Sequence, residues 1–355
     1  MMEKAMPRSE RNGYVSVLKL ISSMFVIFIH VPFPGTFGKA LDGLARFSVA
    51  FFFCVSGYYA YRVDVSGLRR RLKKTTALLI LASGIYFAWN VFQRYFVLHK
   101  GVRRYISGLL TVETAARFVF MGDNPFGGHL WYLMAMILVY FIMISYVRFW
   151  DSRDDINYTP LYCVAVCGYL LQLIFALKVK GTGTKVHFMV YRYCLCFGLP
   201  AFCMGLFLHQ YRDRIVKNYG FSDRKAVLMI VIGSALCLLQ WFGIGSMSMP
   251  IGTVPVVVAL MLVATQARAG SPQSPAKRAF FVCADTCSTV IYVIHLLIDM
   301  VIDGNKKRVP AFKALQSHVW LYPFFILLVS VLIGACVSIV LYVIHSRRAA
   351  RGVRT

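Results

Sequence analysis

Charged residues are scarce in this chain, and acidic residues are the scarcest. The 355 residues include 14 Asp and Glu against 39 Lys and Arg, and charged residues make up 15% of the total. Ordinary soluble domains devote about a quarter of their residues to charge, so the composition excludes that class. Hydrophobic residues reach 59%, which indicates a protein embedded in a lipid bilayer.

Several motifs of soluble enzymes are also missing. The sequence has no glycine-rich phosphate loop, no GxSxG nucleophile turn and no internal repeat. Its ten cysteines lie almost wholly within apolar runs and form no CxxC motif paired with histidines, so we expect packing residues rather than a metal site. We expect one domain over 1–355, with tails at 1–13 and 345–355, no appended soluble domain and no permanently bound cofactor.

Ten apolar runs of roughly bilayer-crossing length follow one another along the chain. They predict an all-α polytopic membrane protein. The runs are 14–31, 44–61, 75–98, 130–149, 158–178, 190–209, 226–243, 251–267, 280–302 and 321–344. The segment 106–120 contains Glu113 and Arg117 and is too polar to cross, so we expect an amphipathic surface piece there. No small-residue cleavage site follows the first run, which indicates a retained helix rather than a signal peptide.

The net charge of +25 is distributed unevenly over the loops. Basic residues number 22 on the side of the two termini and 12 on the opposite side. The positive-inside bias therefore places both termini in the cytoplasm. Basic loops beside membrane helices meet lipid headgroups or a phosphorylated cosubstrate, so we expect no nucleic-acid partner.

Lys19 and His30 lie eleven residues apart in the first run. Eleven residues at about 100° each end about 20° past three full turns, so the two side chains share one helix face. A cation inside a membrane helix is costly unless function requires it. The pair therefore predicts an intramembrane site for a reaction or for transport.

Arg46 stands at the predicted outer start of the second span. A short loop at 32–43 would bring its side chain near His30. The alternative is an arginine that snorkels to the membrane interface.

A polar stripe runs along the ninth predicted span. Ser288, Tyr292, His295 and Asp299 follow i, i+4, i+7 and i+11, with Asp285 about one turn earlier. Four polar groups on one face indicate a wet cavity or a hydrogen-bonded partner helix.

Two further segments have two interpretations each. Trp131 and Tyr132 open the fourth span, where aromatic residues normally form an interfacial belt. Arg69, Arg70 and Arg71 lead a basic run after the second span. This run is either a topology determinant or a dock for phosphate groups, which arginine binds bidentately.

Together these residues resemble four elements of the acyltransferase family 3 membrane proteins, the bacterial O-acyltransferases that modify surface glycans and antibiotics. One element is a basic residue and a histidine separated by ten positions, and another is an Arg-led aromatic run that ends in Ser-Gly-aromatic. The others are Leu-Trp-Tyr-Leu and Ser-x-x-x-Tyr-x-x-His. The matching residues are Lys19 and His30, Arg46 and Phe51–Tyr58, Leu130–Leu133, and Ser288, Tyr292 and His295.

The chain departs from this family pattern at two positions. The family usually has Arg where this chain has Lys19, and Asp where it has Ser16. Lysine keeps the charge but lacks the bidentate fork of arginine. If the family's arginine holds that carboxylate, we expect the carboxylate partner to be missing here as well.

The resemblance implies transfer of an acyl group, usually acetyl, from cytoplasmic acyl-CoA to a hydroxyl of a carbohydrate or glycolipid acceptor such as an exopolysaccharide. His30 would be the general base, Arg46 would stabilise the oxyanion, and Lys19, about 16 Å inward, would hold the donor chain. The CoA phosphates would bind Arg69, Arg70 and Arg71. The substrate path would be lined by Ser56, Trp131, Tyr132, Tyr292 and His295.

Two alternatives remain open. Transfer through an acylated Cys54 or Ser56 would give a ping-pong mechanism. A transporter or flippase with a proton-coupled polar pathway and no acyl chemistry would also use intramembrane charge. For either activity we expect a multi-pass protein of the bacterial inner or plasma membrane.

Overall fold

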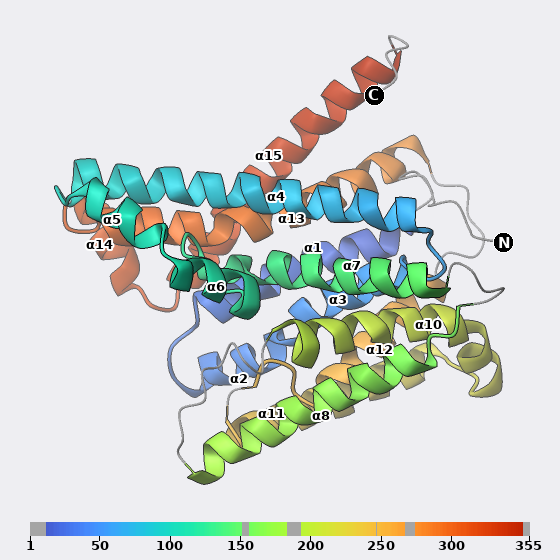
Figure 1. Cartoon of the computed structure of the whole chain (residues 1–355). Coiled ribbons are helices and arrows are strands. Elements are labelled where there is room, and N and C mark those ends of the chain that lie inside the picture. The colour runs from blue at the N-terminus through green and yellow to red at the C-terminus, as the bar shows by residue number, and fades with distance from the viewer. Residues whose placement is uncertain (1–11, 151–155, 183–192, 246, 267–273, 351–355) are drawn as a thin grey trace. The chain divides into compact units, whose positions relative to one another are not determined.

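The computed structural model describes residues 12–150, 156–182, 193–245, 247–266 and 274–350, and these residues form helices and no strand (Figure 1). Nine helical segments among them are at least 18 residues long and apolar enough to cross a membrane. The fold is therefore that of an all-α polytopic membrane protein, as the sequence predicts. Residues 1–11 of the first predicted tail and 351–355 of the second lie outside the described residues.

Nine of the ten predicted spans fall on these segments. The segments are Gly13–His30, Gly35–Tyr58, Val65–Val97, Gly128–Trp150, Thr159–Lys178, Cys194–Asn218, Asp223–Gly243, Pro275–Asn305 and Tyr322–Arg348. The remaining run, 251–267, forms α12 (Thr253–Gln266), which has 14 residues. At 1.5 Å per residue these cover about 21 Å, less than the hydrocarbon core of about 30 Å. The predicted length of this span was thus wrong for the described residues.

A second correction concerns the predicted loop at 32–43. Most of it is helical, because α2 (Gly35–Ala45) begins directly after Pro34. The next helix, α3 (Phe47–Tyr58), starts two residues after α2 ends. Arg46 therefore lies at the junction of two helices within one spanning segment, rather than at the start of a span.

The chain folds into two compact units. Among the described residues, unit 1 comprises 53–220 and 239–249, and unit 2 comprises 12–52, 221–238 and those from Pro250 onward. Unit 1 holds the end of α3, α4 (Val65–Phe92), η2 (Gln93–Val97), α5 (Val102–Leu109), α6 (Val112–Met121), η3 (Gly128–Leu130), α7 (Trp131–Trp150), α8 (Thr159–Thr182), η4 (Cys194–Gly198) and α10 (Leu199–Asn218). Unit 2 holds α1 (Gly13–His30), α2, most of α11 (Asp223–Gly243), α12, α13 (Pro275–Asn305), α14 (Pro310–Ser317) and α15 (Tyr322–Ala350).

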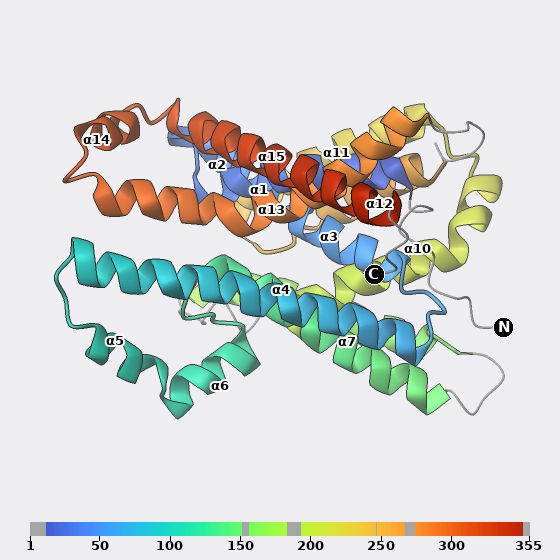
Figure 2. The same ribbon diagram turned by 90° about the horizontal axis from the view of Figure 1, so that it is seen from above.

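In unit 2, α13 packs along both α1 and α15 (Figure 2). Ile27 of α1, Ile291 of α13 and Ile326 of α15 are fully buried in the core that the three helices share. Asn12 caps α1, since its side chain accepts a hydrogen bond from the Tyr14 backbone N–H at 3.0 Å. The same side chain donates to the Ala264 carbonyl of α12 and so fixes the start of α1.

In unit 1, two glycines allow the end of α3 to lie directly on α10. A Cβ atom at Gly57 would lie 1.9 Å from the Phe202 carbonyl oxygen, and one at Gly205 would lie 1.9 Å from the Cys54 carbonyl oxygen. Small residues commonly permit such close helix contacts in membranes. The sequence around Ser56 is therefore held by backbone packing.

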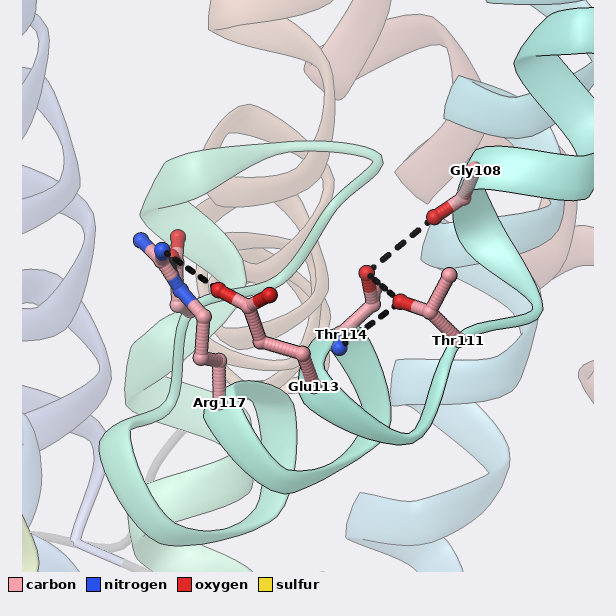
Figure 3. Close-up of polar contacts among 6 residues, drawn as sticks. Gly108, Thr111, Glu113, Thr114 and Arg117 are labelled. Carbon is pink, nitrogen blue, oxygen red and sulfur yellow. Dashed lines mark hydrogen bonds and ion pairs between the residues drawn. The ribbon is translucent and has the colours of Figure 1, made fainter.

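The predicted surface segment 106–120 forms parts of α5 and α6, and neither helix is long enough to cross a membrane. Thr111 caps α6, because its hydroxyl oxygen accepts the Thr114 backbone N–H at 3.1 Å (Figure 3). The Thr114 hydroxyl in turn donates to the Gly108 carbonyl of α5 at 3.2 Å. These contacts join the two short helices.

Candidate active site

His30 and His295 come together in unit 2 from helices far apart in the sequence. Their ring centroids lie 5.3 Å apart with an interplanar angle of 41°. His30 is the last residue of α1 and half-buried, whereas His295 is fully buried on α13. Nδ1 of His295 lies 3.0 Å from the Ile291 carbonyl oxygen and donates to it. In the neutral ring the lone pair is therefore on Nε2.

Lys19 is paired with a carboxylate on the same two helices. Its ammonium forms an ion pair with Asp285 of α13, and the two side chains are 20% and 16% exposed. The family's carboxylate three residues before Lys19 is absent, as expected from Ser16, but Lys19 still has a carboxylate partner. The carboxylate is supplied by α13 instead of α1, a possibility that the sequence signals only as an aspartate one turn before the polar stripe.

The polar stripe of α13 meets its partner helices at two levels. His295 faces His30 of α1, and Asp299 accepts a hydrogen bond of 2.6 Å from the Tyr322 hydroxyl of α15. The Ser288 hydroxyl is buried and has no hydrogen-bond partner among the described residues, and Tyr292 is half-buried. The prediction of a hydrogen-bonded partner helix is thus confirmed at Asp299.

Arg46 is held by a carboxylate one helical turn earlier. Its Nε and Nη2 donate to the two carboxylate oxygens of Asp42, each at 3.0 Å. This fork fixes the guanidinium at the junction of α2 and α3. The i,i+4 spacing of the pair was a signal that the sequence offered, whereas the proximity of Arg46 to His30 stays a prediction.

The predicted path residues of unit 1 lie in an aromatic cluster. Trp131 is only 4% exposed and meets Phe197 with centroids 5.6 Å apart. A belt residue would face lipid, so the belt interpretation of Trp131 was wrong. Tyr132 packs edge-on against Phe53 at 4.7 Å and hydrogen-bonds the Ser56 side chain.

The basic run begins about one turn after the start of α4. Arg69 and Arg70 are exposed, whereas the Arg71 guanidinium donates to the Tyr59 carbonyl. Asp64 caps α4 by accepting the Gly67 backbone N–H at 2.9 Å. A hydrogen bond from the Ser66 hydroxyl is the main cause that lowers the pKa of Asp64.

A second histidine site in unit 1 was not predicted. Nδ1 of His209 donates to the Tyr58 carbonyl at 2.7 Å, and its ring stacks on Tyr61 with centroids 4.9 Å apart. The next residue, Arg62, has a φ of 53°, and its N–H donates to the Tyr158 hydroxyl at 3.2 Å. Burial raises the pKa of Tyr158 to about 12. The only sequence signal was a histidine at the polar end of a predicted span.

No group of three or more His, Cys, Asp or Glu side chains that could hold a metal ion occurs in the described part of the chain. The candidate active site of unit 2 contains the His30 and His295 imidazoles and the ion pairs of Lys19 with Asp285 and of Arg46 with Asp42. Such groups suit proton transfer and charge stabilisation.

The fold and these groups define an all-α polytopic membrane protein with an intramembrane polar site. The sequence matches the family described as acyltransferase domain over residues 12–343, nearly the whole chain, and the protein belongs to this family. No curated protein and no solved structure matches the chain significantly. The protein is therefore a membrane acyltransferase that uses an acyl donor and an acceptor. Family membership favours acyl chemistry over the transporter alternative.

Proposed function

We propose that this acyltransferase moves an acetyl group from cytoplasmic acetyl-CoA to a hydroxyl of a glycan in the bacterial envelope. The observation that carries the proposal is the His30–His295 pair, whose ring centroids lie 5.3 Å apart. A hydroxyl is a poor nucleophile near neutral pH, so its attack on a thioester needs a general base. Imidazole titrates in the useful range, and His30 is that base.

In the proposed reaction His30 accepts the proton of the acceptor hydroxyl as the oxygen attacks the thioester carbonyl. A C–O bond forms, the C–S bond breaks, and CoA leaves as a thiolate that takes up a proton. Arg46, oriented by Asp42, stabilises the oxyanion. Direct transfer is preferred to a ping-pong route because Cys54, one possible carrier, is fully buried.

Two kinds of cation bind the donor in this proposal: exposed arginines and a lysine that is already paired with a carboxylate. Arg69 and Arg70 are exposed and bind the CoA phosphates, and Arg71 supports them from its contact with Tyr59. Lys19 holds the donor chain only as part of its pair with Asp285. The path residues proposed beside them are Ser56, Trp131, Tyr132, Tyr292 and His295.

The test is acetyl-CoA turnover by the purified protein in nanodiscs, with a panel of p-nitrophenyl glycosides as acceptors. Released CoA is quantified by chromatography, since the ten cysteines of the chain would consume a thiol reagent. We expect His30→Ala to lower turnover about 10²–10⁴-fold while CoA binding persists. The matched control is His345→Ala, which changes an exposed histidine at the end of α15. Normal turnover by His30→Ala would overturn the assignment of the base.

A further inference from the structure

The three most exposed large hydrophobic side chains of the described residues all lie outside the spanning segments. They are Val112 at 88%, Leu110 at 82% and Phe120 at 77%. All belong to α5, α6 or the turn between them, here called the α5–α6 arm (Val102–Met121). Apolar exposure of this extent, gathered in one segment, indicates a surface that contacts something other than water.

The arm is folded in a way that fixes this exposure. On α6 the half-buried residues are Thr114, Phe118 and Met121, which follow i, i+4 and i+7 and so face the rest of unit 1. Val112 and Val119 lie on the opposite, exposed face of the helix. The apolar face is thus turned outward by the register of the helix.

Polar contacts hold both ends of α6 in place. Thr111 caps its start (Figure 3). At its other end Gly122 has a φ of 68° and its N–H donates to the Phe118 carbonyl at 3.1 Å. Arg117 forms an ion pair with Asp123 at 2.7 Å and a longer one with Glu113 at 3.7 Å. Val112 and Phe120 therefore belong to an ordered helix.

The other half of the arm is basic and anchored to α4. The Arg94 guanidinium of η2 lies 4.3 Å from the centre of the Tyr105 ring of α5, and this ring stacks on Phe87 of α4. Arg103 and Arg104 are exposed on α5. No acidic residue occurs between Asp64 and Glu113, so the charge of this part of the chain is entirely positive.

We infer that the α5–α6 arm lies in the interfacial zone of the membrane and binds anionic phospholipids. Leu110 and Val112 enter the boundary between headgroups and acyl chains, and Arg103 and Arg104 contact lipid phosphates. Helices that combine an apolar face with Lys or Arg on the polar side bind in this plane, and each cation near an anionic surface strengthens the binding. Exposed apolar side chains next to exclusively positive charge fit an anionic lipid surface better than a soluble glycan.

The experiment measures tryptophan fluorescence of Leu110→Trp in nanodiscs that contain phospholipids brominated on their acyl chains. The signal of the unsubstituted protein, which has five tryptophans, is subtracted. The matched control is Glu113→Trp, since the Glu113 side chain is 81% exposed and is paired with Arg117. We expect the added emission of Leu110→Trp to be blue-shifted and at least halved by bromine, and that of Glu113→Trp to stay unquenched.

A second comparison tests the role of the Arg103 and Arg104 charges. Leu110→Trp is compared in phosphatidylcholine and in mixed phosphatidylcholine and phosphatidylglycerol discs, with and without Arg103→Gln/Arg104→Gln. We expect deeper insertion with phosphatidylglycerol, and loss of this difference when the two arginines are changed. Water-like, unquenched emission from Leu110→Trp in both lipids would overturn the inference and leave the arm open to a soluble partner. Acyl transfer does not enter either readout, so the outcome is independent of the proposed function.

Discussion

The ion pair between Lys19 and Asp285 lies about three helical turns from the contact between His30 and His295 on the same two helices. From the first contact to the second, the residue numbers rise along both α1 and α13, so the two helices run parallel. Two helices that cross the membrane in the same direction must be separated along the chain by an odd number of membrane crossings. Six spanning segments of the described residues lie between α1 and α13. One further crossing is therefore needed, and we expect the short apolar helix α12 to supply it.

This count leads to a prediction about topology. With α12 completing a crossing, the chain crosses ten times and both termini lie on one side of the membrane. We expect a green fluorescent protein fused to either terminus to fluoresce in the cytoplasm, and alkaline phosphatase fused to the C-terminus to be inactive. Active phosphatase at the C-terminus would show that the number of crossings is odd.

The Lys19–Asp285 pair should couple strongly in stability measurements. Asp285→Met or Lys19→Met leaves a half-buried charge without its partner and should cost about 1–3 kcal/mol. Lys19→Met/Asp285→Met removes both charges and should recover most of that loss. Thermal unfolding in detergent measures the coupling, and simple additivity of the two single changes would contradict it.

The same double variant separates a structural role from a role in donor binding. If the proposed contact of Lys19 with the donor chain exists, the stabilised double variant should still bind CoA poorly. Recovery of both stability and CoA affinity would assign Lys19 to helix packing alone.

Substitutions of the three arginines of α4 should have different effects, because the side chains make different contacts. Arg69→Gln and Arg70→Gln should each weaken CoA binding about 10–100-fold, the equivalent of one charge-assisted contact of about 1.5–3 kcal/mol. Arg71→Gln loses its bond to the Tyr59 carbonyl and should lower the unfolding temperature more than the other two changes do. Calorimetric titration with CoA measures the affinity. Pantetheine, which lacks the phosphates, is the control ligand, and equal losses for both ligands would contradict a phosphate dock.

Close helix packing at Gly57 should not tolerate a methyl group. A Cβ there would lie 1.9 Å from the Phe202 carbonyl oxygen, so Gly57→Ala should destabilise the protein by about 1–3 kcal/mol. Gly84→Ala on α4 is the control, because no atom lies within 4 Å of its added Cβ. That change should be neutral or stabilise by about 0.5–1 kcal/mol. Thermal unfolding of the two variants decides the matter, and similar shifts would contradict the contact.

The cap of α4 should make a small, pH-dependent contribution to stability. The pKa of Asp64 is lowered chiefly by the Ser66 hydroxyl, so its stabilising effect is present above the unfolded value of about 3.9 and is lost as the pH falls through the lower folded value. Asp64→Ala should cost about 1 kcal/mol at pH 7. Asp64→Asn keeps a good cap and should remove only the acid-dependent part, as unfolding scans at pH 7 and below pH 4 would show.

Much of the helical framework was readable from the sequence because a bilayer imposes a simple rule. Backbone groups in lipid must bond within their own helix, so long apolar runs had to become helices, and nine of them did. The exceptions were local. Residues 35–45 form α2. This helix was not predicted, because nothing in the sequence of a short segment next to two prolines distinguishes a loop from a helix. The other exception is α12, which is shorter than its apolar run.

Part of the candidate site was also readable, because the 3.6-residue period fixes which side chains share a face. This placed Lys19 and His30 on one face of α1, and Ser288, Tyr292, His295 and Asp299 on one face of α13. The period says nothing about which helix lies opposite. The role of Asp285 was therefore hidden until α13 was seen beside α1.

The sequence alone determined the class of protein, the spans and the polar faces, because composition and helical period act within one segment of chain. Tertiary structure decided the partners: Asp285 for Lys19, His295 for His30 and Tyr322 for Asp299. These pairs join residues more than twenty positions apart. Their formation depends on which helices pack together and in which direction, and no local spacing contains that information.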